Sequence, residues 1–126
     1  MPQVPLNPAF NLLQITSALN HLGTTHLIIN AETNLPYKAP RPIIPLMEHL
    51  ILDLKSTKLE SMTIPTLKKI IVVDNSDGRV DTSELKALDR WEDVARDGEG
   101  EKPADRDLGN DEIINIQFTS GTTSMP

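Results

Sequence analysis

The chain contains no cysteine among its 126 residues, which excludes a disulfide-bonded scaffold and a zinc site with cysteine ligands. It also lacks an apolar run long enough to cross a membrane as a helix, which takes about 20 residues. No stretch rich in lysine and arginine offers the positive charge that nucleic-acid phosphates require. The sequence therefore predicts neither a membrane span nor a nucleic-acid partner.

Aromatic side chains are scarce, at 3% of the residues, so a hydrophobic core must be built from leucine, isoleucine and valine. The charge is unevenly distributed: residues 1–73 carry six bases and four acids, whereas residues 74–126 carry six bases and fourteen acids. The first residues lack the basic and then apolar order of a secretory signal. We therefore expect an intracellular protein, with its compartment open among cytoplasm, mitochondrion and peroxisome.

The N-terminal part predicts a helix with start and stop signals. Asn7 can cap this helix, Pro8 suits its first turn, and Gly23 stands where a helix ends. Between these signals, apolar residues recur at helical spacing: Leu12, Ile15, Leu19 and Leu22. The next apolar run, residues 27–29, is too short for a helix and is typical of a buried strand.

Prolines interrupt the following region, so residues 31–45 predict a loop. A short helix is expected from Pro45 to Leu54, and residues 55–66 predict another connection. Residues 69–74 begin with a lysine and end with an aspartate, and the four residues between them are β-branched and apolar. Such a continuous run is typical of a buried parallel strand. Residues 75–78, Asn-Ser-Asp-Gly, then have strong turn chemistry.

The remaining residues predict two helical segments, a loop and a strand. Residues 81–88 begin with an aspartate, and a glutamate three residues later resembles a capping pair, so a helix is expected there. Residues 91–94 predict one more helical turn. Residues 97–111 are rich in charge and poor in apolar residues, which predicts a flexible acidic loop. Residues 113–118 predict the last strand.

Strands separated by helical segments indicate an α/β fold, with a partial parallel sheet and flanking helices.

Two patterns could suggest a metal site, but neither predicts one. The spacing of residues 75–84 resembles a calcium loop only superficially, because a strand precedes it where a calcium-binding loop needs a helix. The histidines, His21, His26 and His49, have no second ligand at metal spacing.

The residues after the last predicted strand carry the chemical signal of the chain. They are one glycine and five hydroxyl residues: Thr119, Ser120, Gly121, Thr122, Thr123 and Ser124. The glycine lets the backbone approach a ligand closely, and successive amides and hydroxyls can donate hydrogen bonds to phosphate oxygens. The Gly-Lys-Ser/Thr ending of a Walker loop is not present. We therefore predict that these six residues form a phosphate-binding loop of another type.

The string Ile116-Gln-Phe-Thr-Ser-Gly-Thr-Thr-Ser-Met-Pro126 resembles the AMP-binding signature of the adenylate-forming superfamily. This superfamily includes acyl-CoA synthetases, luciferases and nonribosomal peptide adenylation domains. Residues 6–10, 69–74, 91–94 and 111–118 are similar to the segments that precede this loop in the superfamily. Within it, the chain looks nearest to fungal-type medium-chain fatty-acid–CoA ligases. The resemblance implies that residues 1–126 are an incomplete piece of the large N-terminal domain of such an enzyme.

By this resemblance, the parent enzyme would activate a carboxylic acid, such as a fatty acid, as acyl-AMP and transfer it to CoA. ATP, Mg²⁺ and CoA would be its cofactors, and the loop at residues 119–124 would hold the β- and γ-phosphates of ATP. The acyl pocket, the adenine and ribose contacts, the Mg²⁺-binding glutamate and the catalytic lysine of the family would all follow Pro126. The resemblance therefore implies that these 126 residues alone do not complete the reaction.

Two other classes of function stay open. The chain could be a truncated, non-enzymatic remnant that serves as an interaction module, or a stand-alone nucleotide-binding domain. The sequence after Pro126 separates the ligase from the remnant, and an ATP titration tests the nucleotide-binding domain.

Overall fold

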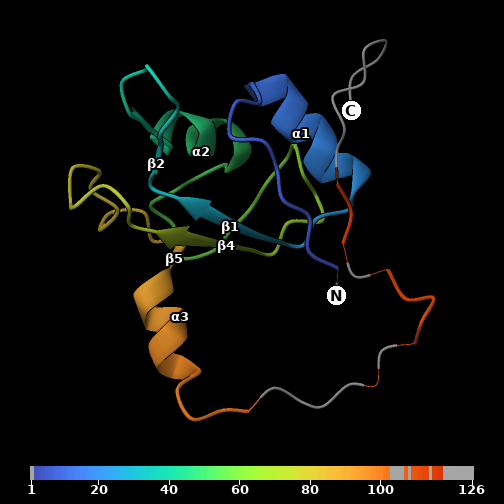
Figure 1. The fold of residues 1–126 in the computed structure, drawn as a ribbon. Coiled ribbons are helices and arrows are strands. Elements are labelled where there is room, and N and C mark those ends of the chain that lie inside the picture. Colours follow the sequence, from blue (N-terminus) through green and yellow to red (C-terminus); the bar gives the residue numbers. More distant parts are fainter. Residues whose placement is uncertain (1, 103–106, 108, 114, 118–126) are drawn as a thin grey trace.

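The computed structural model describes residues 2–102, 107, 109–113 and 115–117. A parallel three-stranded sheet lies at its centre, in the order β1–β4–β5. Its strands are β1 (His26–Asn30), β4 (Lys69–Val73) and β5 (Asp89–Arg90). Figure 1 shows helices α1 (Leu12–His21) and α2 (Ile44–Leu50) on one side of the sheet and α3 (Trp91–Asp97) on the other. The predicted α/β class and parallel sheet are confirmed.

Helix α1 begins later than the sequence predicts. Its N-cap is Asn11, whose side chain accepts a hydrogen bond from the amide of Gln14 at 2.9 Å, while the Gln14 side chain accepts one from the Asn11 amide at 3.0 Å. This reciprocal pair is a capping box. The predicted cap, Asn7, instead accepts a hydrogen bond from the amide of Ala9 in a turn before the helix. The prediction was wrong because Asn7 has no glutamine or glutamate three residues later.

The end of α1 is confirmed at Gly23. This glycine has a φ of 59°, in the left-handed region that other residues rarely adopt. Its amide donates to the carbonyl of Asn20, and the amide of Thr24 donates to that of Leu19 at 3.0 Å. These two bonds form a Schellman motif, which satisfies the last carbonyls of the helix.

The central strand β4 is buried on both faces, as its continuous apolar sequence predicts. Ile70 and Val72 face the main core, and Ile71 is also only 8% exposed. The neighbouring strand β1 was expected to be buried too, but Ile28 is 62% exposed, whereas Leu27 and Ile29 pack against the core. The strand is confirmed and its complete burial is wrong, because β1 lies at the edge of the sheet and no helix among the described residues covers Ile28.

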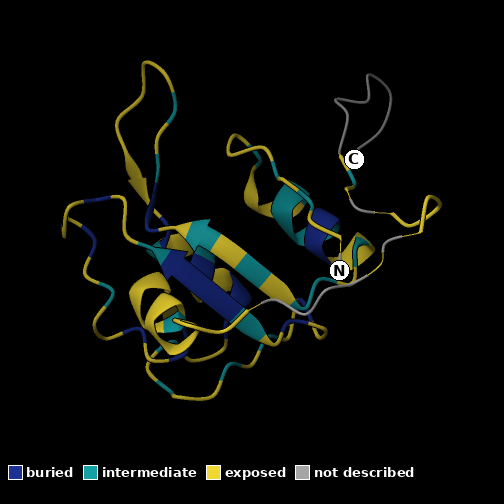
Figure 2. Cartoon of the chain, turned by 60° about the horizontal axis from the view of Figure 1, so that its bottom comes forward, coloured by how far each residue is buried: buried dark blue, intermediate teal, exposed yellow. Residues whose placement is uncertain are grey.

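The main core fills the space between the sheet and helices α1 and α2. Its largest fully buried side chains are aliphatic or methionine: Leu19, Met47, Leu50, Ile64 and Ile70. Figure 2 shows buried residues, in dark blue, in β4 and in the helices α1 and α2, whereas α3 is almost wholly exposed. The scarcity of aromatic residues is thus met by packing aliphatic chains from both layers.

The proline-rich region contains more structure than the predicted loop. Strands β2 (Glu32–Thr33) and β3 (Arg41–Pro42) pair in antiparallel fashion. The amide of Ile43 then donates to the carbonyl of Ala31, which brings the chain back to the end of β1. Helix α2 follows at once and ends at Leu50, four residues before the predicted end, because Ile51 adopts an extended conformation.

The helix predicted over residues 81–88 does not form. The carboxylate of Asp81 accepts hydrogen bonds from the amide and the hydroxyl of Ser83, two residues on, so it stabilises a turn where a helix cap would bond the third residue. The amide of Ala87 donates to the carbonyl of Leu54 at 3.1 Å, a partner far away in sequence. By contrast, the turn predicted at residues 91–94 is confirmed and extends to the seven-residue helix α3.

The predicted acidic loop begins where α3 ends. Among its described residues (97–102, 107 and 109–111), those after Asp97 belong to neither a helix nor a strand, and all are exposed. The flexibility of this loop stays a prediction.

Candidate functional site

The predicted phosphate loop, Thr119 to Ser124, lies outside the described residues. The strand expected before it is described only at residues 113 and 115–117. There, Asn115 makes an isolated parallel bridge with Gln3, and the amide of Ile116 donates to the carbonyl of Gln3 at 3.4 Å. Ile113 is 68% exposed. The described part of this segment thus contacts the N-terminal residues and does not join the three-stranded sheet.

A cluster of polar residues follows the carboxyl ends of β1 and β4, which meet at one edge of the sheet. In open parallel sheets this edge is the usual place for a ligand. Glu32 comes shortly after β1, and Asp74, Asn75 and Arg79 come after β4. From the sequence, residues 75–78 were predicted to form a turn, and the resemblance of residues 75–84 to a calcium loop did not predict a site. The signal available in the sequence is the position of polar residues directly after two apolar strands, although only the structure shows that these strands are neighbours.

Asn75 continues the sheet hydrogen bonds beyond the last paired residues. Its side-chain oxygen accepts from the amide of Glu32 at 3.0 Å, and its side-chain nitrogen donates to the carbonyl of Glu32, also at 3.0 Å. The amide side chain thus replaces a strand residue opposite Glu32. This pairing fastens the chain after β1 to the chain after β4.

The Glu32 side chain is 4% exposed and forms an ion pair with Arg79, whose own side chain is exposed. The hydrogen bond to Glu32 and the negative charge of Glu32 both raise the pKa of Arg79 above its ordinary value. Burying a carboxylate without a partner is costly, so Arg79 is needed for Glu32 to occupy this position.

Between Asn75 and Arg79, a tight turn is held by Asp74 and Ser76. The Asp74 carboxylate accepts from the Ser76 hydroxyl at 2.7 Å and from the Ser76 amide at 2.8 Å. These hydrogen bonds, with one from the Gly78 amide, lower the pKa of Asp74. The fully buried Ser76 hydroxyl also accepts from the amide of Val80 at 3.0 Å. The turn predicted at residues 75–78 is confirmed.

The cluster of Glu32, Asp74, Asn75, Ser76 and Arg79 is therefore bonded internally. Within the described part of the chain, no buried side-chain nitrogen or oxygen lacks a hydrogen-bond partner. A ligand site needs donors or acceptors that are free to turn to the ligand, and this cluster uses its own to hold two loops together. The cluster lies where ligands often bind, but its hydrogen bonds and ion pair stabilise the two loops.

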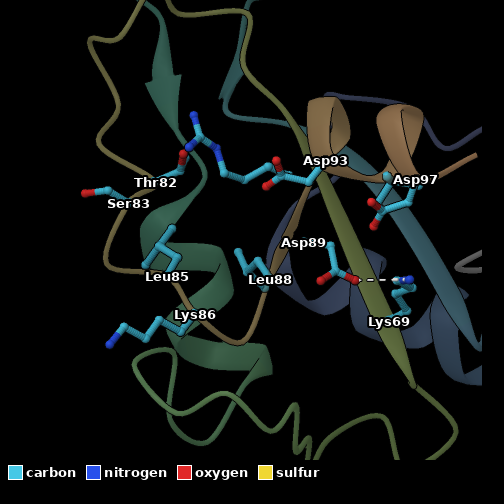
Figure 3. Close-up of a pocket in the computed structure, with 11 residues that line it drawn as sticks. Lys69, Thr82, Ser83, Leu85, Lys86, Leu88, Asp89, Asp93 and Asp97 are labelled. Carbon is cyan, nitrogen blue, oxygen red and sulfur yellow. Dashed lines mark ion pairs between the residues drawn. The ribbon is translucent and has the colours of Figure 1, made fainter. Parts of the chain in front are cut away.

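A pocket of about 230 Å³ lies between β5, α3 and the turns of residues 82–88. Figure 3 shows the ion pair between Lys69 and Asp89, at 3.2 Å, on its wall, with Asp93 and Asp97 approaching from α3. Leu85 and Leu88 provide its apolar part. The pocket is smaller than typical ligand pockets of about 300–1,000 Å³, and its acidic and basic residues balance. It offers no concentrated charge for a phosphate or a metal ion.

Among the described residues, no group of three or more histidine, aspartate or glutamate side chains could hold a metal ion. The helices of the same residues include none that is long and apolar enough to cross a membrane.

Comparison with known proteins finds no matching family model, no matching curated protein and no matching solved structure.

Proposed function

We propose that the chain is part of an ATP-dependent, AMP-forming acyl-CoA synthetase that activates a fatty acid as acyl-AMP and transfers it to CoA. The observation that carries the proposal is the ordered string Thr119-Ser-Gly-Thr-Thr-Ser-Met-Pro126, which resembles the AMP-binding signature at each position. A single glycine-rich loop would be weak support. Here eight consecutive positions agree in order, and a segment that predicts a strand precedes them.

The α/β architecture is compatible with this proposal, but only at the level of fold class. Parallel sheets with helices on both sides bind many kinds of ligand, so the fold does not identify the reaction. The specific support remains the chemistry of residues 119–124.

Those residues suit the task of holding a polyphosphate. Backbone amides and short hydroxyls can donate hydrogen bonds to phosphate oxygens without adding a formal charge. In the proposed reaction, the carboxylate oxygen of the fatty acid bonds to the α-phosphorus while the bond to the β-phosphate oxygen breaks, and pyrophosphate leaves. Donors placed around the departing phosphates position them and stabilise their charge. Mg²⁺ would supply the positive charge that the loop lacks.

The first experiment is to read the transcript beyond the codon for Pro126. We expect a lysine codon next, followed in frame by a longer coding sequence with the remaining motifs of the superfamily. A stop codon directly after Pro126 would instead support the non-enzymatic remnant.

The second experiment measures fatty-acid-dependent exchange between ATP and pyrophosphate in the protein that carries this chain and its continuation. Thr122→Ala or Thr123→Ala should reduce the exchange rate by about 10²-fold, as expected when a donor to developing charge is lost. Ser124→Gly is the matched control, because glycine is the commoner residue at this position of the signature, and its rate should stay near that of the wild type. Equal rates for all three variants would contradict the role given to the loop.

A further inference from the structure

The outer edge of β1 differs from the opposite edge of the sheet. Among the described residues, β4 is the only strand that pairs with β1. The other edge strand, β5, has just two residues, Asp89 and Arg90, both charged, and α3 follows it immediately. Charge and short length are common devices that prevent edge strands from pairing with other chains. Strand β1 has the sequence His-Leu-Ile-Ile-Asn, which contains no lysine, arginine, aspartate or glutamate, no proline and no glycine.

The hydrogen-bond register shows which backbone groups of β1 point away from the sheet. The amide of Lys69 donates to the carbonyl of Thr25, and the amide of Ala31 donates to the carbonyl of Val73. Every second residue of a strand faces the same neighbour, so Leu27 and Ile29 also direct their backbone groups to β4. The amides and carbonyls of the alternate residues, His26, Ile28 and Asn30, therefore point outward.

This outward row is self-complementary. If a second β1 lies antiparallel to the first with Ile28 opposite Ile28, the outward groups of each strand meet those of the other in hydrogen-bonded pairs. The same register places His26 opposite Asn30 and Leu27 opposite Ile29. Apolar residues then meet apolar residues and polar residues meet polar residues, with no pair of like charges. Ile28, now 62% exposed, gains an apolar neighbour.

We propose that β1 is a homotypic interaction site, through which two copies of this chain form one continuous six-stranded sheet. A two-fold axis perpendicular to the sheet passes beside Ile28, so that each copy presents the same surface to the other. The partner is a second copy, because the strand is symmetric in polarity about Ile28. This inference is independent of the proposed ligase function, since it uses none of residues 119–126.

Analytical ultracentrifugation of the 126-residue chain over a wide concentration range tests the proposal. The wild type should show a monomer–dimer equilibrium. Ile28→Lys should shift this equilibrium at least tenfold toward monomer, because two lysines would face each other across the axis. Met62→Lys is the matched control: Met62 is an exposed apolar residue outside the sheet, at 81% exposure, and the same added charge should leave the dimer unchanged.

Amide hydrogen exchange gives a second readout that does not depend on a variant. As the concentration rises, exchange should slow at His26, Ile28 and Asn30, whereas Leu27 and Ile29 should be protected at all concentrations. A wild type that stays monomeric overturns the proposal. Equal dimerisation of the two lysine variants would also overturn it, as would larger aggregates that form equally with and without Ile28→Lys. The same holds if exchange at the outward amides does not change with concentration.

Discussion

At the scale of single residues, hydrogen bonds of a few polar side chains decide where the loops lie. Asn75 bonds both backbone groups of Glu32, and Arg79 pairs with the buried Glu32 carboxylate. The sequence shows that these residues are polar and lie in or near turns. It does not show that residues 32 and 79 meet, because that contact depends on β1 and β4 being neighbours in the sheet.

Loss of Arg79 should be costly because it leaves the Glu32 carboxylate buried without a partner. We expect Arg79→Leu to lower the free energy of unfolding more than the loss of a fully exposed ion pair does, measured by urea denaturation. The control is Lys58→Leu, which removes an exposed ion pair with Glu60 and should cost less than about 1 kcal/mol. Equal losses in the two variants would show that the Glu32–Arg79 pair has no special role.

Asp74 should make the stability depend on pH in the acidic range. Its folded-state pKa lies below the ordinary value of 3.8, because the hydroxyl and amide of Ser76 donate to the carboxylate. Its contribution to stability is therefore fully present above pH 3.8 and is lost as the pH falls through the folded-state pKa. We expect Asp74→Asn to flatten the dependence of the urea midpoint on pH in that window. An unchanged slope would contradict this assignment.

At the scale of elements, the punctuation of α1 shows what local sequence can and cannot predict. The helix itself, its apolar stripe and its end at Gly23 follow from spacing and from the conformational freedom of glycine. Its start does not, because Asn7 and Asn11 are both good cap residues and only Asn11 has a glutamine at the position that completes the capping box.

The two asparagines give a direct test of the observed start. Asn11→Ala should lower the free energy of unfolding by about 1 kcal/mol, because it removes the side chain that satisfies the Gln14 amide. Asn7→Ala should cost clearly less, since Asn7 stabilises only an exposed turn. Urea denaturation of both variants measures the difference, and a larger loss for Asn7→Ala would place the cap at the predicted position after all.

At the scale of the whole molecule, the sheet is packed unevenly. The face of Ile70 and Val72 lies against the main core, with α1 and α2 above it, whereas on the other face α3 is the helix of the described part of the chain that contacts β4 and β5. This arrangement leaves Ile28 exposed at the edge. A continuous apolar run such as residues 27–29 cannot show by itself that one of its faces is uncovered.

Most of the stability should therefore come from one face of the sheet. Ile70→Ala should lower the free energy of unfolding by about 2–5 kcal/mol, because Ile70 is fully buried in the main core. Leu52→Ala, at a residue that is 66% exposed, should change it by less than about 0.5 kcal/mol. Thermal or urea unfolding gives both values. Similar losses at the two positions would mean that the main core is not formed as described.

The sequence by itself determined the α/β class, a strand at residues 27–29 and one at residues 69–74 (observed at 26–30 and 69–73), the helix that ends before Gly23 and the turn at residues 75–78. Each of these depends on local periodicity or on the backbone preference of one residue. Only the tertiary structure decided the pairing of Glu32 with Arg79, the exposure of Ile28 and the turn that replaces a helix at residues 81–88. Those features depend on which distant groups become neighbours: the amide of Ala87 bonds to the carbonyl of Leu54, and no local pattern specifies that partner.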